Sequence, residues 1–356
     1  FASLLDKSLK TEKMKKIYLI REDSSALGGA EIYLKRLSDK LTSYGIDHEV
    51  INSFFPRFLP SWLRVILFNI QVTVGKKRKF YFSLERIICP NVYRAGDGVH
   101  RVFLRVEKKS RLNPLHPLYL FLEKKCFNRA EKIIANSKMI REQIIDEYNI
   151  DPTKIKVIYN GISHCKIDYK ASWEKLSSEF HLQMNTKIIL FVGSGFKRKG
   201  VDEFLQILSR LEYRDFKAFI VGKEKQIDSY RLRAYGLGLK EKVFFTGPIR
   251  NVNDFYVVAD VFILPTRYEP FSNVILEAMS FGSVVFTTKQ NGAHEIISDE
   301  FIMSHSEDFS VVKKIDMLLN DVGLLNKHKE LNVQIAKKYT VERNMNETLS
   351  VIKDVM

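Results

Sequence analysis

Two glutamates, Glu269 and Glu277, stand with seven residues between them, where an apolar run gives way to a helical pattern. The run 261–264 predicts the end of a buried strand, Ser272 is a typical helix cap, and Gly282 is a helix stop. We therefore expect Glu269 in a loop at the carboxyl end of a strand and Glu277 about one turn into the next helix. Free amides at such a helix start suit a diphosphate, and ionised carboxylates accept hydrogen bonds from sugar hydroxyls.

A loop with glycines and a pair of cations, Arg198 and Lys199, follows the apolar run 187–192. A guanidinium can bind phosphate oxygens through two N–H groups, and an ammonium adds a compact charge. Gly193 and Gly195 lack the third glycine of a dinucleotide fingerprint, and the loop has no Walker pattern, so neither of those sites is predicted. The pattern favours an anion site; a solvated basic loop is the alternative.

The N-terminal half opens with a strand–helix–strand pattern. Residues 16–20 are apolar, a helical pattern runs to Tyr44, and residues 48–51 start the next strand. Gly28 and Gly29 fall at the helix start, where glycines let the backbone approach a ligand and the amides are free. A plain loop before a helix is the alternative.

A carboxylate, Asp97, lies between Gly96 and Gly98. Flanking glycines leave room beside the backbone, so this side chain is a candidate to face a ligand. An Asp–Gly turn without a ligand is the alternative.

Apolar strands alternate with helical patterns along both halves of the 356-residue chain. Such alternation predicts an α/β fold with doubly wound parallel sheets, and the length predicts two domains. Ligands of these sheets bind at the carboxyl ends of the strands. The turn at Ile249 and Arg250 falls at one such end.

The net charge of +15 is concentrated in one half of the chain. Residues 1–180 hold 33 Lys and Arg against 20 Asp and Glu, whereas residues 181–356 hold 24 against 22. Within 51–111 the count is 13 against 3. A field of this kind predicts an anionic partner: a membrane face, an anionic lipid-linked acceptor or nucleic acid.

The segment 53–82 is rich in aromatic and aliphatic residues and ends in the basic run 76–79. Such a segment can lie in a membrane interface. A helix packed on the domain core, with a solvated basic tail, is the alternative.

The ends and the cysteines favour a cytoplasmic protein. The sequence contains no run of 18 uncharged apolar residues, so no membrane-spanning helix is predicted. The first residues lack the basic-then-apolar pattern of a signal peptide. Met14 looks like a natural start, so we expect 1–13 to be an upstream extension. Three cysteines fit a reducing compartment rather than a disulfide or zinc framework.

The residue order over 265–282, Pro-x-x-x-Glu-Pro-Phe-Ser-Asn-x-x-Leu-Glu-Ala-Met-x-x-Gly, resembles the signature of retaining nucleotide-sugar glycosyltransferases of the GT-B fold. These are the "glycosyl transferases group 1" (family 4) enzymes. Segments 93–100 and 196–202 make the likeness strongest to lipopolysaccharide core glucosyltransferases.

The resemblance covers 14–356 and implies two Rossmann-like doubly wound domains that face a central cleft. Residues 14–172 would bind the acceptor and residues 173–335 the nucleotide sugar. Residues 336–356 would form a helix that crosses back to the first domain.

The resemblance also implies the activity: transfer of a hexose, expected to be glucose from UDP-glucose, with retention at the anomeric carbon. The acceptor would be a membrane-associated anionic glycolipid or oligosaccharide, such as a lipopolysaccharide or lipooligosaccharide core. The enzyme would be a peripheral protein on the inner face of the cytoplasmic membrane. Nucleic acid would not be a partner. It would need no cofactor or metal, because Arg198 and Lys199 stabilise the leaving nucleotide.

In this resemblance Asp97 faces the acceptor hydroxyl, with His100 as its rival, and Glu269, Arg198 and Lys199 act on the donor. Ser272 stands where the family has glycine, which bears on the identity of the sugar. The residues expected to bind the donor are Gly28, Gly29, Gly193, Arg198, Lys199, Ile249, Arg250, Glu269, Phe271, Ser272, Asn273, Val274 and Glu277.

Two other functions stay open at this point. A nucleic-acid-binding protein could use the basic half, although the sequence has no recognisable module of that kind. A sugar-nucleotide epimerase could use the same fold without an acceptor, but segment 53–82 argues against it. Salt-dependent retention on DNA, without hydrolysis of UDP-sugars, would favour the nucleic-acid-binding protein.

Overall fold

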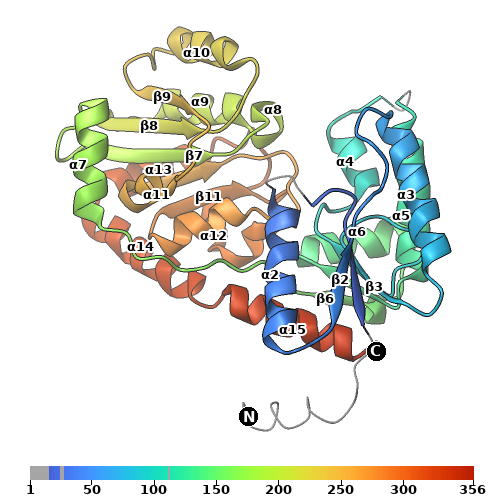
Figure 1. The fold of residues 1–356 in the computed structure, drawn as a ribbon. Coiled ribbons are helices and arrows are strands. Elements are labelled where there is room, and N and C mark those ends of the chain that lie inside the picture. Colours follow the sequence, from blue (N-terminus) through green and yellow to red (C-terminus); the bar gives the residue numbers. More distant parts are fainter. Residues whose placement is uncertain (1–15, 25–27, 111–112) are drawn as a thin grey trace. The chain divides into compact units, whose positions relative to one another are not determined.

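The computed structural model describes residues 16–24, 28–110 and 113–356. The chain divides into two compact units (Figure 1): one runs up to Ile158 and takes in Glu342–Met356, and the other is Tyr159–Val341. The sequence placed these boundaries after residues 172 and 335. Each unit holds one parallel sheet with helices, which confirms the predicted α/β class.

The first unit is built on six parallel strands in the order β2-β1-β3-β4-β5-β6. Their apolar sequences match their place between layers of helices, and all four residues of β3 are buried. The strands are β1 (Ile17–Ile20), β2 (His48–Ile51), β3 (Phe80–Ser83), β4 (Val92–Ala95), β5 (Lys132–Ala135) and β6 (Ile155–Val157).

Helices flank this sheet (Figure 1), and the last helix of the chain joins them through a hydrogen bond of 2.8 Å between the hydroxyls of Tyr33 and Thr348. They are α2 (Gly29–Ser43), α3 (Ser61–Gly75), α4 (His100–Val106), α5 (Leu115–Arg129), α6 (Lys138–Tyr148), the 3-10 turn η1 (Pro152–Lys154) and α15 (Val341–Lys353). Among the described residues, no helix combines the length and apolar character that crossing a bilayer requires.

The second unit also has six parallel strands, in the order β12-β11-β10-β7-β8-β9. The first strand in sequence is thus central, and the chain winds outward from it in both directions, as in the doubly wound dinucleotide-binding sheets. The strands are β7 (Lys187–Val192), β8 (Phe216–Val221), β9 (Val243–Gly247), β10 (Val261–Leu264), β11 (Val284–Thr288) and β12 (Ile302–Met303).

The core of the second unit is one continuous apolar cluster between the sheet and its helices, with Phe191, Phe204 and Phe219 fully buried. The helices are α7 (Tyr169–Phe180), α8 (Phe196–Lys199), α9 (Val201–Arg210), α10 (Ile227–Gly236), α11 (Asn253–Val258), α12 (Asn273–Ser280), α13 (Val311–Asn320) and α14 (Val322–Ala336), with 3-10 turns η2 (Gly292–Ile296) and η3 (Asp299–Phe301).

Candidate active site

The strand order of the second unit places the loops of interest together. β7 and β10 are neighbours in register, with Ile189 opposite Val261 and Leu190 opposite Phe262. The chain leaves these two strands toward opposite sides of the sheet, and ligands bind where that reversal occurs. The loop with Arg198 follows β7, and the loop with Glu269 follows β10, so both predicted motifs meet at this point.

The segment after β7, which the sequence predicted as a loop, contains the one-turn helix α8 (Phe196–Lys199). Fully buried Phe196 anchors this turn in the core, and Gly195 and Gly200 bracket it in the left-handed region at φ 74° and 82°. A Cβ on Gly200 would lie 2.0 Å from the carbonyl oxygen of Pro265. Glycine at this position therefore allows the segments after β7 and β10 to touch.

Backbone hydrogen bonds then lock the two segments together. The carbonyl of Arg198 accepts from the amide of Arg267 at 2.9 Å and from the hydroxyl of Thr266 at 3.0 Å. Further along, Glu269 donates its amide to the carbonyl of Gln290 and accepts from the amide of Gly292, both at 2.9 Å. The backbone of each charged residue is thus fixed before any ligand binds.

The centre of the site is one carboxylate held by two cations. The Glu269 Oε2 atom lies 2.5 Å from Arg198 Nη1 and 2.6 Å from Lys199 Nζ. Arg198 Nη1 also donates to the carbonyl of Tyr268 at 2.9 Å, and Lys199 Nζ to the hydroxyl of Ser272 at 3.3 Å. The Glu269 side chain is 17% exposed, and 8% of Lys199 is exposed.

Burial and charge oppose each other in this cluster. Burial alone would raise the pKa of Glu269, but Lys199 and Arg198 outweigh burial and hold that pKa below its ordinary value. Burial lowers the pKa of Lys199; Glu269 opposes this effect and the like charge of Arg198 adds to it. Because one carboxylate faces two cations, Glu269 is ionised, and the cluster keeps a surplus of one positive charge that an anion can neutralise.

Helix α12 begins beside this cluster, and Ser272 stands at its N-cap position, as the sequence predicted. Ser272 occupies the cap position without a side-chain bond to the helix, and its hydroxyl accepts from Lys199 instead. The amide of Ile275 donates to the carbonyl of Ser272 at 3.2 Å, whereas the first two amides of α12, those of Asn273 and Val274, lack the usual side-chain acceptor. Together with Lys199, this helix start can bind an anion.

Glu277 lies on the half-exposed face of α12, and one of its oxygens has a partner that the sequence did not reveal. The buried Tyr256 hydroxyl donates to Glu277 Oε2 at 2.9 Å. Burial, with the nearby Glu277 carboxylate, raises the pKa of Tyr256 well above its ordinary value, so the tyrosine stays a donor. The bond fixes the rotamer of Glu277.

The remaining predicted donor residues of this unit take different places. Gly193 lies against the Lys199 side chain, because a Cβ there would be 3.4 Å from Lys199 Cγ. The Phe271 ring is buried, 6.0 Å from the ring of Tyr159, so it packs rather than faces open space. Asn273 accepts from the side-chain amide of Asn160 at 2.8 Å, and Val274 is half-buried. Ile249 is half-buried and Arg250 exposed, in the turn after β9.

The predicted acceptor residues belong to the first unit, at the carboxyl ends of its strands. Asp97 follows β4 and is exposed. His100 begins α4, and its Nε2 atom lies 3.3 Å from His116 Nδ1. Burial, with the positive charge of Arg86, lowers the pKa of His100 to about 4, so the ring is neutral near pH 7. Gly28 and Gly29 stand at the start of α2, and a Cβ on Gly29 would meet no atom within 4 Å.

A cluster that the sequence analysis missed lies next to Asp97. Arg21, directly after β1, binds Glu31 at 2.6 Å and Glu85 at 2.8 Å. Burial raises the pKa of Glu85 to about 7; Arg21 opposes this shift, and the charge of Asp97 adds to it. The sequence feature that could have predicted this cluster is the position of Arg21 and Glu85, each directly after an apolar run that forms a strand.

A second missed residue is Asn291, which is fully buried beside the Glu269 loop. Its Oδ1 atom accepts from the amides of Ser272 at 3.3 Å and Ala293 at 3.2 Å, and its Nδ2 donates to Thr287 at 3.1 Å. Asn291 therefore positions the segment that carries Glu269 and Ser272. Within the described ranges, no group of three His, Cys, Asp or Glu side chains is placed to hold a metal ion.

Solved structures share this two-domain architecture. WaaG, a glycosyltransferase involved in lipopolysaccharide biosynthesis, aligns with a TM-score of 0.79 and 18% identity over 94% of this chain and 99% of its own. The Anabaena protein Alr3699/HepE, in complex with UDP and glucose, aligns with a TM-score of 0.74 and 18% identity over 96% and 100%. These likenesses define the class: a GT-B fold.

The family follows from two sequence models. Residues 174–338 match the glycosyl transferases group 1 model, and residues 93–164 match that of Glycosyltransferase Family 4. An uncharacterized glycosyltransferase of Methanocaldococcus jannaschii is 31% identical over 239 residues, which are 63% of this chain and 60% of the relative. The chain thus matches the glycosyl transferases group 1 family over residues 174–338. It spans about three fifths of the length of the first curated relatives that it matches.

Proposed function

We propose that this protein is a retaining glycosyltransferase that moves a hexose from a UDP-sugar, without a metal ion, onto a membrane-associated glycolipid acceptor. The observation that carries the proposal is the single carboxylate of Glu269 between Arg198 and Lys199 at the start of α12. The family match supports a nucleotide-sugar donor, and the UDP and glucose bound by Alr3699/HepE support UDP and a hexose.

The donor diphosphate would replace Glu269 as the binding partner of the two cations in this cluster. Its oxygens would bind Arg198, Lys199 and the first amides of α12, and thus neutralise the surplus positive charge. The same cations would stabilise the charge that develops on the leaving nucleotide, which is the usual route by which a preorganised site lowers a barrier. Glu269 would then turn its oxygens to hydroxyls of the donor sugar, and Glu277, oriented by Tyr256, to those of the ribose.

Retention would follow from reaction on one face of the donor sugar. The leaving phosphate would help to take the acceptor proton, and the protein would supply alignment and charge. Asp97, exposed beside the Arg21–Glu85 cluster, would orient the acceptor hydroxyl. His100 is less suited to a charged role, because its lowered pKa keeps it neutral and its ring is held against His116.

The surface of α3 and α5 supports a membrane partner. Val65, Phe68 and Val72 turn one side of α3 into the core, which agrees with the packed-helix interpretation of this segment. The other side stays apolar: Ile70, Val74 and Phe121 are 54%, 74% and 53% exposed and line an apolar groove of about 270 Å³ between α3 and α5.

Charge beside this groove favours one kind of occupant, the acyl region of an anionic membrane. The basic run 76–79 directly follows α3, and 51–111 carry 13 basic against 3 acidic residues. Apolar side chains flanked by lysine and arginine bind membrane interfaces that carry negative headgroups. The acceptor of such an enzyme would be a lipid-linked glycan, consistent with the lipopolysaccharide role of WaaG.

The test is a nucleotide-release assay with a panel of UDP-sugars, with and without a lipid-linked glycan extract, on the wild type and Glu269→Gln. We expect one donor to release UDP faster with the extract, and Glu269→Gln to lose most of that rate. UDP should still bind Glu269→Gln at least as tightly, because the variant raises the positive charge of the cluster. A Glu307→Gln variant on an exposed loop is the matched control. Absence of UDP binding and release by the wild type would overturn the proposal.

A further inference from the structure

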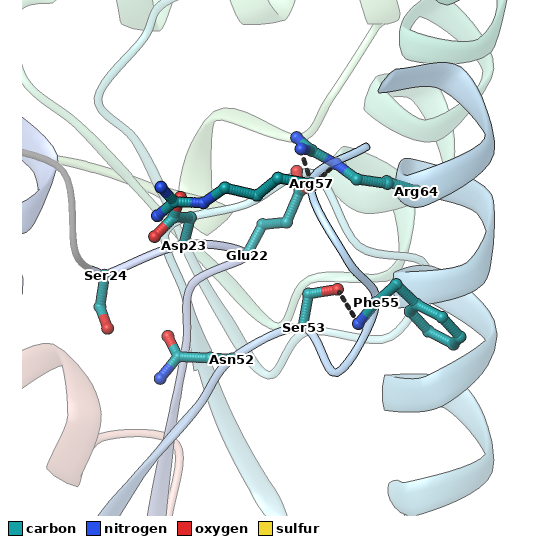
Figure 2. Close-up of a pocket in the computed structure, with 8 residues that line it drawn as sticks. All are labelled: Glu22, Asp23, Ser24, Asn52, Ser53, Phe55, Arg57 and Arg64. Carbon is teal, nitrogen blue, oxygen red and sulfur yellow. Dashed lines mark hydrogen bonds and ion pairs between the residues drawn. The ribbon is translucent and has the colours of Figure 1, made fainter. Parts of the chain in front are cut away.

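A polar pocket of about 280 Å³ lies in the first unit, at the carboxyl ends of β1 and β2 (Figure 2). Glu22, Asp23 and Ser24 line it from the segment after β1, Asn52 and Arg57 from the segment after β2, and Arg64 from α3. Its volume lies just below the range of small-ligand sites, about 300–1,000 Å³, which suits a ligand as small as one sugar ring. None of these residues belongs to the donor site or to the predicted acceptor residues.

The charges in this pocket cancel. Arg64 Nη2 lies 3.0 Å from Glu22 Oε1, and Arg57 Nη2 lies 2.5 Å from Asp23 Oδ2. Two guanidiniums and two carboxylates leave no net formal charge to attract a free phosphate. A guanidinium has five N–H donors and a carboxylate several lone pairs, and Arg64 uses only its Nε and Nη2 atoms on one oxygen of Glu22, so this pair has donors and acceptors to spare. This chemistry suits a neutral group with many hydroxyls.

A buried polar atom without a partner points to the same kind of ligand. The Oδ1 atom of Asn52 is buried and has no hydrogen-bond partner among the described residues. Buried polar atoms are seldom left unpaired, and an orphaned acceptor in a polar pocket suits a donor from a ligand. Figure 2 shows the side chains of Ser24 and Asn52 on one side of the pocket, with the Phe55 ring turned away from both. The Ser53 hydroxyl, in contrast, accepts from the amide of Phe55 at 3.2 Å.

The position of the pocket relates it to the acceptor. The amide of Glu22 donates to Glu85 Oε1 at 3.3 Å, and the negative charge of Asp97 contributes to raising the pKa of Glu85. On the other side, the chain that forms the pocket wall carries Phe54 and Phe58, which are 84% and 86% exposed. The pocket therefore lies between the carboxylate cluster beside Asp97 and aromatic side chains suited to a membrane surface.

We propose that this pocket binds a neutral sugar ring of the glycan acceptor, next to the ring that receives the transferred hexose. The proposal rests on the proposed function. The ring donates a hydroxyl to Asn52 Oδ1 and accepts from N–H groups of Arg64. Ser24 supplies a hydroxyl that serves as donor or acceptor. The pocket thereby selects the acceptor by its last sugars, while the lipid stays at the membrane surface.

Saturation-transfer NMR on the full chain tests the pocket, with UDP added in excess. The probes are the methyl α-glycosides of glucose, galactose and N-acetylglucosamine. We expect at least one glycoside to receive saturation from the wild type, and Asn52→Ala and Ser24→Ala to reduce the signal at least fivefold. Asn128→Ala on the exposed face of α5 is the matched control and should keep the wild-type signal.

Two further arms distinguish other occupants. Inorganic phosphate is titrated by ³¹P NMR, and vesicles of phosphatidylglycerol are pelleted with the wild type and Arg57→Ala. Phosphate binding or vesicle binding that depends on Arg57, or glycoside binding that Asn52→Ala and Ser24→Ala leave unchanged, would overturn the proposal. So would the absence of any glycoside signal from the wild type.

UDP binding, measured by calorimetry on the same samples, separates this inference from the proposed function. The pocket variants should bind UDP like the wild type, because neither Asn52 nor Ser24 is among the residues expected to bind the donor. A wild type that binds no UDP contradicts the proposed function. A wild type that binds UDP but whose glycoside signal is independent of Asn52 and Ser24 contradicts this inference alone.

Discussion

At the scale of single residues, the chemistry depends on what surrounds each charge. Lys199 is a buried ammonium that shares one carboxylate with Arg198, and Glu85 is a half-buried carboxyl whose bond to Arg21 does not offset its partial burial. Burial destabilises the charged forms of Lys199 and Glu85. It also acts on Glu269, but there two cations outweigh burial and keep the carboxylate ionised. The three residues therefore differ in charge behaviour although each has an ion-pair partner.

Replacing Lys199 with alanine tests the role of this buried cation. The change removes a charge that would stabilise the leaving nucleotide, and removing one preorganised group of this kind typically costs about 10²–10³ in kcat. We expect a loss of that size in UDP release, with the fold intact by circular dichroism. Lys197→Ala, on the exposed side of the same turn, is the control and should retain the wild-type rate. Equal losses in both variants would contradict a specific role for Lys199.

Glu85 makes a separate prediction about pH. Its pKa in the folded protein is about 7, above the ordinary value of 4.5, so the folded state binds more protons than the unfolded state between these pH values. The free energy of unfolding should therefore fall as the pH rises from about 4.5 to 7, by about 3 kcal/mol. Urea unfolding from pH 4.5 to 8, followed by a probe in the first unit, measures this loss.

The variant Glu85→Gln cannot titrate and should lose correspondingly less stability over that range. Glu131→Gln, at an exposed position, controls for the removal of one negative charge from this unit. A Glu85→Gln curve parallel to that of the wild type would show that Glu85 does not titrate in this window.

At the scale of elements, the donor site depends on the contact between α8 and the segment after β10. Gly200 and Gly195 let the chain turn into and out of α8, and Phe196 holds this turn in the core. The segment after β10 is held by Arg198 on one side and by Gln290 and Gly292 on the other. The site is therefore built on short, well-anchored turns at the ends of two adjacent strands.

Gly200→Ala tests this contact. The added Cβ would lie 2.0 Å from the Pro265 carbonyl oxygen in a backbone conformation that suits only glycine. Strain and overpacking together should cost roughly 2–5 kcal/mol, visible as a lower thermal transition of the second unit. Gly236→Ala is the matched control: it ends α10, no atom lies within 4 Å of its added Cβ, and alanine there should be neutral or stabilising by about 0.5–1 kcal/mol.

At the scale of the whole molecule, charge is divided between the two halves of the chain. The first 180 residues hold 33 basic and 20 acidic side chains, and the remainder is nearly balanced. The apolar groove of α3 and α5 and the basic run 76–79 belong to the same charged half. We infer that this half meets the membrane, whereas the more balanced half holds the nucleotide.

Vesicle pelleting tests this division. Each basic residue near an anionic bilayer contributes about 1 kcal/mol, so Lys77→Gln with Arg78→Gln should weaken partition into phosphatidylglycerol vesicles roughly 30-fold. Added salt should weaken the binding of the wild type in the same direction. Lys327→Gln with Lys337→Gln, both exposed in the second unit, is the control and should bind like the wild type. Equal binding by both double variants would contradict a directed charge.

Local sequence determined the strands, the helix starts and the place of the donor motifs. The alternation of apolar runs and helices gave both sheets, because burial between two layers of helices requires strands that are apolar on both faces. It also located Arg198, Lys199 and Glu269 at carboxyl ends of strands. The start of α12 at Ser272 was predicted, but its hydroxyl bonds Lys199 rather than the helix, and the predicted loop after β7 contains the helical turn α8. Contacts of Lys199 and the buried Phe196 impose these differences.

Only the tertiary structure decided which charges meet. Arg198 and Glu269 are 71 residues apart and come within 2.5 Å because β10 pairs with β7, a choice that no local pattern expresses. The bond from Tyr256 to Glu277, the anchoring of Ser272 by Asn291, and the burial of Glu85 arise in the same way. Burial and ion pairing depend on strand order, and strand order is a property of the whole sheet.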